Sequence, residues 1–156
     1  MADLRLGKIT PNDPRVQSKT ATLNGITYSY LLAEPCGTPL LNTIFLIHGF
    51  PDISLGWRYQ IPVLTSLGLR VVALDMMGYS GTDAPEDIKY YTYKRAADDV
   101  ASLAKQLGLS SIILGGHDWG GAVYTELLCI ILTSCLHFFQ SARHFSLPNQ
   151  FMFPPQ

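Results

Sequence analysis

The sequence predicts an α/β fold in which a mostly parallel sheet carries helices on both faces. Short apolar runs at residues 43–47, 70–74 and 112–114 have the length and composition of buried strands. Two stretches with helical periodicity, residues 57–67 and 93–107, lie between these runs. Strands that alternate with helices along a chain are typical of a parallel sheet, because parallel neighbours need a crossover connection.

Local signals define the remaining elements. Residues 20–23 and 26–32 are predicted to form an antiparallel hairpin, because the tight-turn pair Asn24-Gly25 joins them. Residues 93–107 are predicted to end as a helix at Gly108. Their apolar positions recur at helical spacing: Tyr93, Ala97, Val100, Leu103, Ala104 and Leu107.

A glycine-rich segment follows the apolar run at residues 112–114 directly, and Asp118 lies at its centre. We interpret it as a strand that turns sharply into a helix, with Asp118 in the strained central position. Gly116 and Gly120 are expected to let the backbone pass close to itself, and Gly121 to let the helix pack near the strand. Taken alone, the segment fits a nucleophile turn and a glycine-rich loop with a capping aspartate equally well.

A second motif, His48-Gly49-Phe50-Pro51, follows the apolar run at residues 43–47. Pro51 restricts the backbone of this loop. We expect the His48 ring to fix the loop by hydrogen bonding. It is not expected to act as a base, because a carboxylate nucleophile needs none in its first step.

Three motifs follow one another in the sequence. They are His48-Gly49-Phe50-Pro51, then Asp75-Met76-Met77-Gly78-Tyr79-Ser80-Gly81-Thr82-Asp83-Ala84-Pro85, then Gly116-His117-Asp118-Trp119-Gly120-Gly121. Together they resemble the epoxide hydrolases of the α/β-hydrolase fold, over about residues 20–123. Met77 and Ser80, in the second motif, depart from the residues that are usual there.

The resemblance implies a reaction. Asp118 would open a small hydrophobic epoxide and form an alkyl-enzyme ester, which a histidine-activated water would then hydrolyse. Tyrosines of a separate cap region would protonate the leaving oxygen. The N–H groups of Phe50 and Trp119 would form the oxyanion hole. No cofactor or metal is implied, and the residues expected to shape the site are His48, Gly49, Pro51 and His117.

Other functions remain open. Haloalkane dehalogenases share the Asp-Trp pair but usually carry Asn where this chain has Phe50, and fluoroacetate dehalogenases usually carry Arg in place of Trp119. Both differences favour the epoxide interpretation. A non-catalytic fragment that binds the full-length enzyme is the third alternative.

The sequence changes character after the nucleophile turn. In the family, the catalytic acid and histidine follow later strands, whereas the only acid after Asp118 is Glu126 and the only histidines are His137 and His144. All 13 glycines lie at or before Gly121. We therefore expect a partial core domain at residues 1–123 and an aberrant apolar tail at residues 124–156, from a frameshift or a retained intron. The genomic sequence beyond codon 123 tests this: some reading frame must restore a charged helix and a strand.

Consequences follow for stability and for the tail. The turn helix is expected to continue to about residue 133, and residues 140–156 to be irregular because they lack periodicity and contain three prolines. Without the later strands of the family's sheet, the strand at residues 111–115 would have an exposed apolar edge. We therefore expect self-association or aggregation and an unstable or inactive product. Residues 127–142 carry no acidic or basic side chain, but this stretch is too short to form a stable membrane span.

Composition sets the remaining limits. A length of 156 residues with 47% hydrophobic residues fits one domain with a core. The net charge of −1 gives no indication of nucleic-acid binding. The three cysteines lack metal-ligand spacing, and the N-terminus has no apolar secretory core. We therefore expect a cytoplasmic protein without a metal site.

Overall fold

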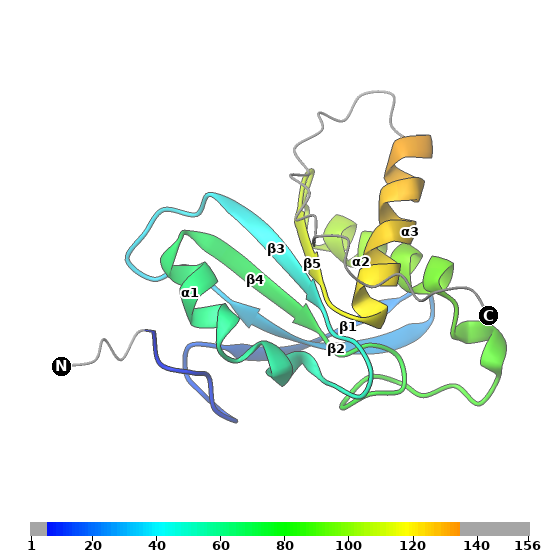
Figure 1. Cartoon of the computed structure of the whole chain (residues 1–156), viewed down its shortest axis with the longest axis horizontal. Coiled ribbons are helices and arrows are strands. Elements are labelled where there is room, and N and C mark those ends of the chain that lie inside the picture. Colours follow the sequence, from blue (N-terminus) through cyan, green and yellow to red (C-terminus); the bar gives the residue numbers. More distant parts are fainter. Residues whose placement is uncertain (1–5, 135–156) are drawn as a thin grey trace, which may run out of the picture.

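Five strands form one mixed sheet in the computed structural model, which describes residues 6–134 (Figure 1). The spatial order is β1-β2-β4-β3-β5, with β2 antiparallel to both β1 and β4, and with β4, β3 and β5 parallel. The predicted hairpin and the predicted parallel strands are therefore confirmed. The strands are β1 (Gln17–Leu23), β2 (Ile26–Ala33), β3 (Asn42–Ile47), β4 (Leu69–Leu74) and β5 (Ile113–Gly116).

Helices cover both faces of the sheet, with α1 on one face and the pair α2 and α3 on the other (Figure 1). The α/β prediction is confirmed as the N-terminal part of an α/β fold. The helical elements are η2 (Ser54–Trp57), α1 (Gln60–Ser66), η3 (Ile88–Tyr90), α2 (Tyr93–Gln106) and α3 (Trp119–Ser134).

The predicted helix at residues 57–67 is wrong in its first part. Residues Ser54–Trp57 form a 3-10 turn, and α1 begins only at Gln60. Pro62 explains the shift. In α1 it lies in the first turn, where its missing N–H is tolerated, whereas a helix from Trp57 would place it where a donor is needed.

Alternation along the strands divides the core between the two faces. Phe45 and Ile47 of β3 face α2 and α3, and they pack with the buried Val100 and Leu103. Ile44 and Leu46 face the other way, in a second cluster that includes Ile61 of α1. Helices thus cover the apolar core on both faces of the sheet.

Helix α2 has a side-chain cap at its start and the predicted glycine just past its end. Thr92 accepts a hydrogen bond from the Arg95 N–H at 3.1 Å, and Gly108 has a φ of 68° just past the end. Ala97, Val100 and Leu103 are fully buried, as predicted, whereas Tyr93 in the first turn is 47% exposed.

Helix α3 continues to Ser134, which confirms the predicted continuation of the turn helix. The predicted irregular segment and the histidines His137 and His144 lie outside the described residues. Between residues 6 and 134, no helix combines the length and the apolar character needed to cross a bilayer. The cytoplasmic location stays a prediction.

Candidate active site

Asp118 occupies the sharp turn between β5 and α3, with a φ of 55°. Such a left-handed conformation is costly for a non-glycine residue and persists only where the surroundings impose it. The side chain is exposed at the edge of the sheet where the parallel strands end. A strained, exposed carboxylate at this edge is a candidate catalytic group.

Two of the three glycines around Asp118 are required by close backbone contacts. A Cβ on Gly116 would lie 2.5 Å from the Gly120 carbonyl oxygen, and a Cβ on Gly120 would overlap the carbonyl oxygen of Ile47. Both expectations are confirmed. The expectation for Gly121 is wrong, because a Cβ there meets nothing within 4 Å.

The carboxylate of Asp118 binds the loop that follows β3. Its Oδ2 accepts a hydrogen bond from the Phe50 N–H at 2.9 Å. Ile47 at the end of β3 pairs with Gly116 at the end of β5, so the two loops leave adjacent strands at the same level. Hydrogen bonds from the backbone N–H groups of Phe50 and then Trp119 lower the pKa of Asp118, which is therefore ionised at neutral pH.

The side chains of Phe50 and Trp119 form an apolar wall beside the carboxylate. Their rings are stacked, with centroids 5.6 Å apart and an interplanar angle of 30°. The two side chains are 60% and 57% exposed. Exposed stacked aromatic rings next to a charged group offer contact area to an apolar ligand.

Gly49 and Pro51 flank Phe50 in the same loop. A Cβ on Gly49 would lie 2.5 Å from both Cβ and Oδ2 of Asp118, so the approach of the carboxylate requires glycine. The Phe50–Pro51 peptide bond is cis. The two residues thus lie where the sequence analysis expected residues that shape the site, and their role stays a prediction.

His48 is buried and makes the hydrogen bonds that were expected of it. Its Nε2 accepts from the Met76 N–H at 2.9 Å, so its Nδ1 carries the proton and donates to the Gly49 carbonyl oxygen at 2.8 Å. The ring also meets the ring of Tyr79 edge-on, with centroids 5.0 Å apart. Both nitrogens are occupied in holding the loop, and neither is free to act as a base.

His117 precedes Asp118 and is exposed. Its backbone N–H donates to the Ile47 carbonyl oxygen at 3.4 Å, and its ring lies edge-on to Trp57 with centroids 6.5 Å apart.

Among the described residues, no group of three His, Cys, Asp or Glu side chains is placed to hold a metal ion.

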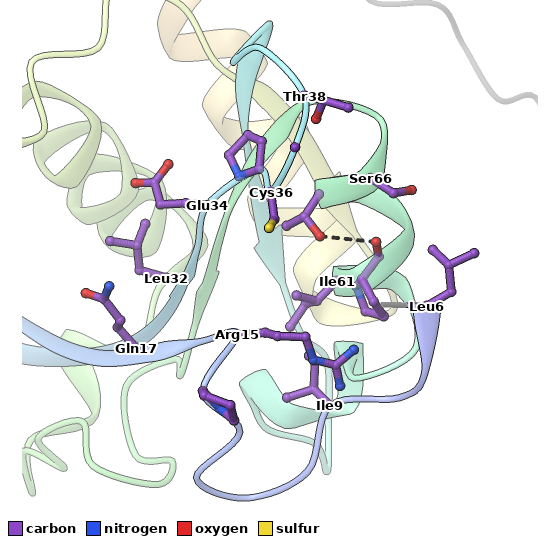
Figure 2. Close-up of a pocket in the computed structure, with 15 residues that line it drawn as sticks. Leu6, Ile9, Arg15, Gln17, Leu32, Glu34, Cys36, Thr38, Ile61 and Ser66 are labelled. Carbon is purple, nitrogen blue, oxygen red and sulfur yellow. Dashed lines mark hydrogen bonds between the residues drawn. The ribbon is translucent and has the colours of Figure 1, made fainter. Parts of the chain in front are cut away.

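A cavity of about 570 Å³ lies away from these residues, between the N-terminal segment, β2 and α1 (Figure 2). Ala33 at the end of β2 pairs with Val71 near the start of β4, so this cavity lies at the end of the sheet where the parallel strands begin. Asp118 is at the opposite end. The cavity lining includes Ile9, Leu32, Cys36 and Ile61.

Two residues that hold the Phe50 loop are not among the site residues predicted from the sequence. Asp75 and Ser54 are both buried, and the Asp75 Oδ1 accepts a hydrogen bond from the Ser54 N–H at 2.7 Å. Two signals pointed to Asp75: it directly follows a strand, at the edge where ligands bind, and it is the first residue of the second motif that resembles the family.

Known proteins are similar to this chain in sequence and in fold. An epoxide hydrolase of Neurospora crassa is 40% identical over 142 residues, which cover 82% of this chain and 42% of that protein. Epoxide hydrolase A of Mycobacterium tuberculosis is 37% identical over 100 residues, with 64% of this chain and 30% of that protein covered. The crystal structure of an epoxide hydrolase of Vigna radiata has a TM-score of 0.69 and 35% identity, over 76% of this chain and 37% of that one.

The chain spans less than half the length of each of these relatives. A sequence model of the α/β-hydrolase fold family matches residues 42–137, which include β3, the loop with Phe50, and the turn with Asp118. The three relatives named above are epoxide hydrolases, and the chain belongs to the α/β-hydrolase fold family.

Proposed function

We propose that this chain carries the nucleophile and oxyanion hole of an epoxide hydrolase. One observation supports the proposal above the others: the carboxylate of Asp118, on a residue with a φ of 55°, accepts a hydrogen bond from the Phe50 N–H. A structural aspartate that caps a helix needs no donor from another loop. The epoxide hydrolases among the relatives support the choice of substrate class.

In this proposal the two carboxylate oxygens of Asp118 have different tasks. Oδ2 is held by the Phe50 N–H, so Oδ1 is the oxygen that attacks an epoxide carbon. A C–O bond forms, the ring C–O bond breaks, and the alkoxide takes a proton to give a hydroxyalkyl ester. Oδ2 becomes the ester carbonyl oxygen. The N–H groups of Phe50 and Trp119 then stabilise the oxyanion that forms when water attacks the carbonyl carbon.

The later steps need groups that the described residues do not supply in this arrangement. Both nitrogens of His48 are occupied, so it does not activate the water. We assign activation of the water, and assisted protonation of the alkoxide, to groups outside these 156 residues. The activity of a whole enzyme is thus part of the proposal.

The expected result for the 156-residue chain is a trapped ester. Incubation with an aryl epoxide such as styrene oxide should add the mass of one epoxide to the chain, measured by intact-mass spectrometry. The ester should accumulate because Asp118 attacks without a base and the alkoxide can take its proton from solvent water at the exposed carboxylate, whereas hydrolysis of the ester needs a base. Since hydrogen bonding lowers the pKa of Asp118, its ionised fraction, and hence the rate of addition, should stay flat between about pH 5 and pH 8.

Two variants control this result. Asp118→Asn should abolish the adduct, and peptide mapping of the wild-type adduct should locate it on Asp118. Gly49→Ala should slow addition at least about tenfold, because its Cβ displaces the carboxylate. A folded wild-type chain that forms no adduct, or an adduct that persists in Asp118→Asn, would contradict the proposal. An alkyl halide that reacts faster than the epoxide would favour the dehalogenase alternative instead.

We also propose that the chain self-associates through the free edge of β5. Within the described part of the chain, β5 pairs with β3 alone, and Ile113 is 39% exposed. An unprotected apolar edge pairs readily with another chain. Sedimentation velocity should show concentration-dependent oligomers of the wild type and a larger monomer fraction for Ile113→Lys. Equal monomer fractions would contradict this proposal.

A further inference from the structure

The loop that carries the Phe50 N–H is tied at both ends to the loop that follows β4. On one side, the Met76 N–H binds His48, whose Nδ1 donates to the Gly49 carbonyl oxygen. On the other side, the carboxylate of Asp75 binds the Ser54 N–H at 2.7 Å. Two consecutive residues of the β4 loop thus hold the two ends of a short segment, residues 49–54, that contains the proposed oxyanion donor.

The Asp75 contact supplies a bond that the segment cannot make for itself. Ser54 begins η2, and the residue before it, Ile53, has no side chain that caps the turn. The Ser54 N–H is buried, so without the Asp75 carboxylate it would have no acceptor, and burying an unpaired donor is costly. Asp75 itself is only 3% exposed.

Asp75 is in turn fixed to the hairpin. Its N–H donates to the Ser29 carbonyl oxygen at 3.0 Å, and its carbonyl oxygen accepts from the Thr82 hydroxyl at 2.6 Å. The same hydroxyl accepts from the Ser29 N–H at 2.9 Å. The carboxylate therefore projects from a backbone that is held by β2, and it acts as a rigid anchor.

We propose that Asp75 is a positioning residue that holds the Phe50 N–H at hydrogen-bonding distance from Asp118. Asp75 does not touch Asp118; it acts through Ser54 and the segment that leads back to Phe50. Oxyanion donors are effective only when they are held in place before the reaction, so loss of the anchor weakens the donor without removing it. Only the catalytic role of Asp75 rests on the proposed function. The contacts that lead from Asp75 through Ser54 to Phe50 and Asp118 exist without any substrate.

The test measures the pKa of Asp118 in the full chain by NMR, from the pH dependence of its side-chain ¹³Cγ shift. The Phe50 N–H is the largest cause that lowers this pKa. Asp75→Ala should therefore raise the pKa of Asp118 by about 0.5 unit or more and move the Phe50 amide proton upfield. Asp75→Asn keeps an acceptor oxygen and should restore most of the wild-type value.

The matched control is Asp83→Ala. Asp83 lies in the same loop, and its carboxylate accepts a hydrogen bond from the Thr27 N–H at 2.7 Å. Its backbone groups bond to Thr27 and Gly78, so none of its hydrogen bonds reaches residues 49–54. This variant should leave the pKa of Asp118 unchanged. If it moves the pKa as much as Asp75→Ala does, or if a folded Asp75→Ala leaves the pKa unchanged, the inference is overturned.

A second variant covers the case in which Asp75→Ala does not fold. Ser54→Pro removes the N–H that Asp75 binds, at a first-turn position that tolerates proline, after a residue that is already extended. It should raise the pKa of Asp118 in the same direction, and an unchanged pKa would overturn the inference. Because no epoxide is used, a pKa shift without any trapped ester would leave Asp75 as the anchor and overturn only the proposed function.

Discussion

Replacing Gly120 with alanine is expected to lower the free energy of unfolding by about 3 kcal/mol or more. The new Cβ would overlap the carbonyl oxygen of Ile47 and lie 2.9 Å from that of His48. Both obstacles are backbone atoms at the end of β3, which is held between β4 and β5, so neither can turn aside. The start of α3 must move instead, and Asp118 moves with it.

Gly121→Ala is the matched control for this prediction. Gly121 is the next residue of the same helix, and a Cβ there meets nothing within 4 Å. Alanine is favoured over glycine inside helices by up to about 1 kcal/mol, so this variant should be neutral or more stable. Urea unfolding followed by tryptophan fluorescence measures both. A Gly120→Ala variant as stable as the control would show that the turn is looser than the structure indicates.

Asp99→Ala is expected to cost about 3 kcal/mol of stability. Asp99 lies in α2 with a side chain that is fully buried, and it accepts hydrogen bonds from the Tyr28 hydroxyl at 2.8 Å and from Asn24 Nδ2 at 2.6 Å. Arg95 donates to the same carboxylate at 3.0 Å and also to the Asn24 carbonyl oxygen. The network ties the hairpin turn to α2.

The reason for the large effect is the group that is left behind. Burial, and then the charge of Asp99, raises the pKa of Tyr28, so its hydroxyl stays protonated and needs an acceptor. Removing Asp99 leaves that hydroxyl buried without a partner, and it also removes the contact that holds Asn24 in its left-handed conformation, at a φ of 48°.

Asp98→Ala provides the comparison, because Asp98 is the adjacent residue with a solvent-exposed carboxylate. Its carboxylate pairs with Lys94 at 2.8 Å, one helical turn away, and the side chain is 40% exposed. Exposed pairs of this kind contribute about 0.5 kcal/mol or less. Thermal and urea unfolding of the two variants should therefore differ clearly, and equal losses would contradict a buried network at Asp99.

Local patterns were sufficient for most of the elements. The hairpin turn at Asn24-Gly25 and the stop at Gly108 lie where the sequence predicts them, because each depends on residues a few positions apart. The error at residues 57–67 is also local in origin, because Pro62 fits only a helix that begins close before it. Helix α2 begins at Tyr93, as predicted, but the Tyr93 side chain is exposed, because periodicity does not show where a helix leaves the core.

The sequence by itself determined the turn around Asp118, since a strand, small residues and a helix must follow one another for such a turn to form. Only the tertiary structure decided what this carboxylate meets. The register of β3 against β5 brings the Phe50 N–H to Asp118, which lies 68 positions away in the sequence. The Met76 N–H, 28 positions from His48, selects the tautomer of that histidine. The burial of Asp75 and Asp99 was decided in the same way. Each depends on partners from distant segments, because a buried carboxylate is stable only where such donors converge.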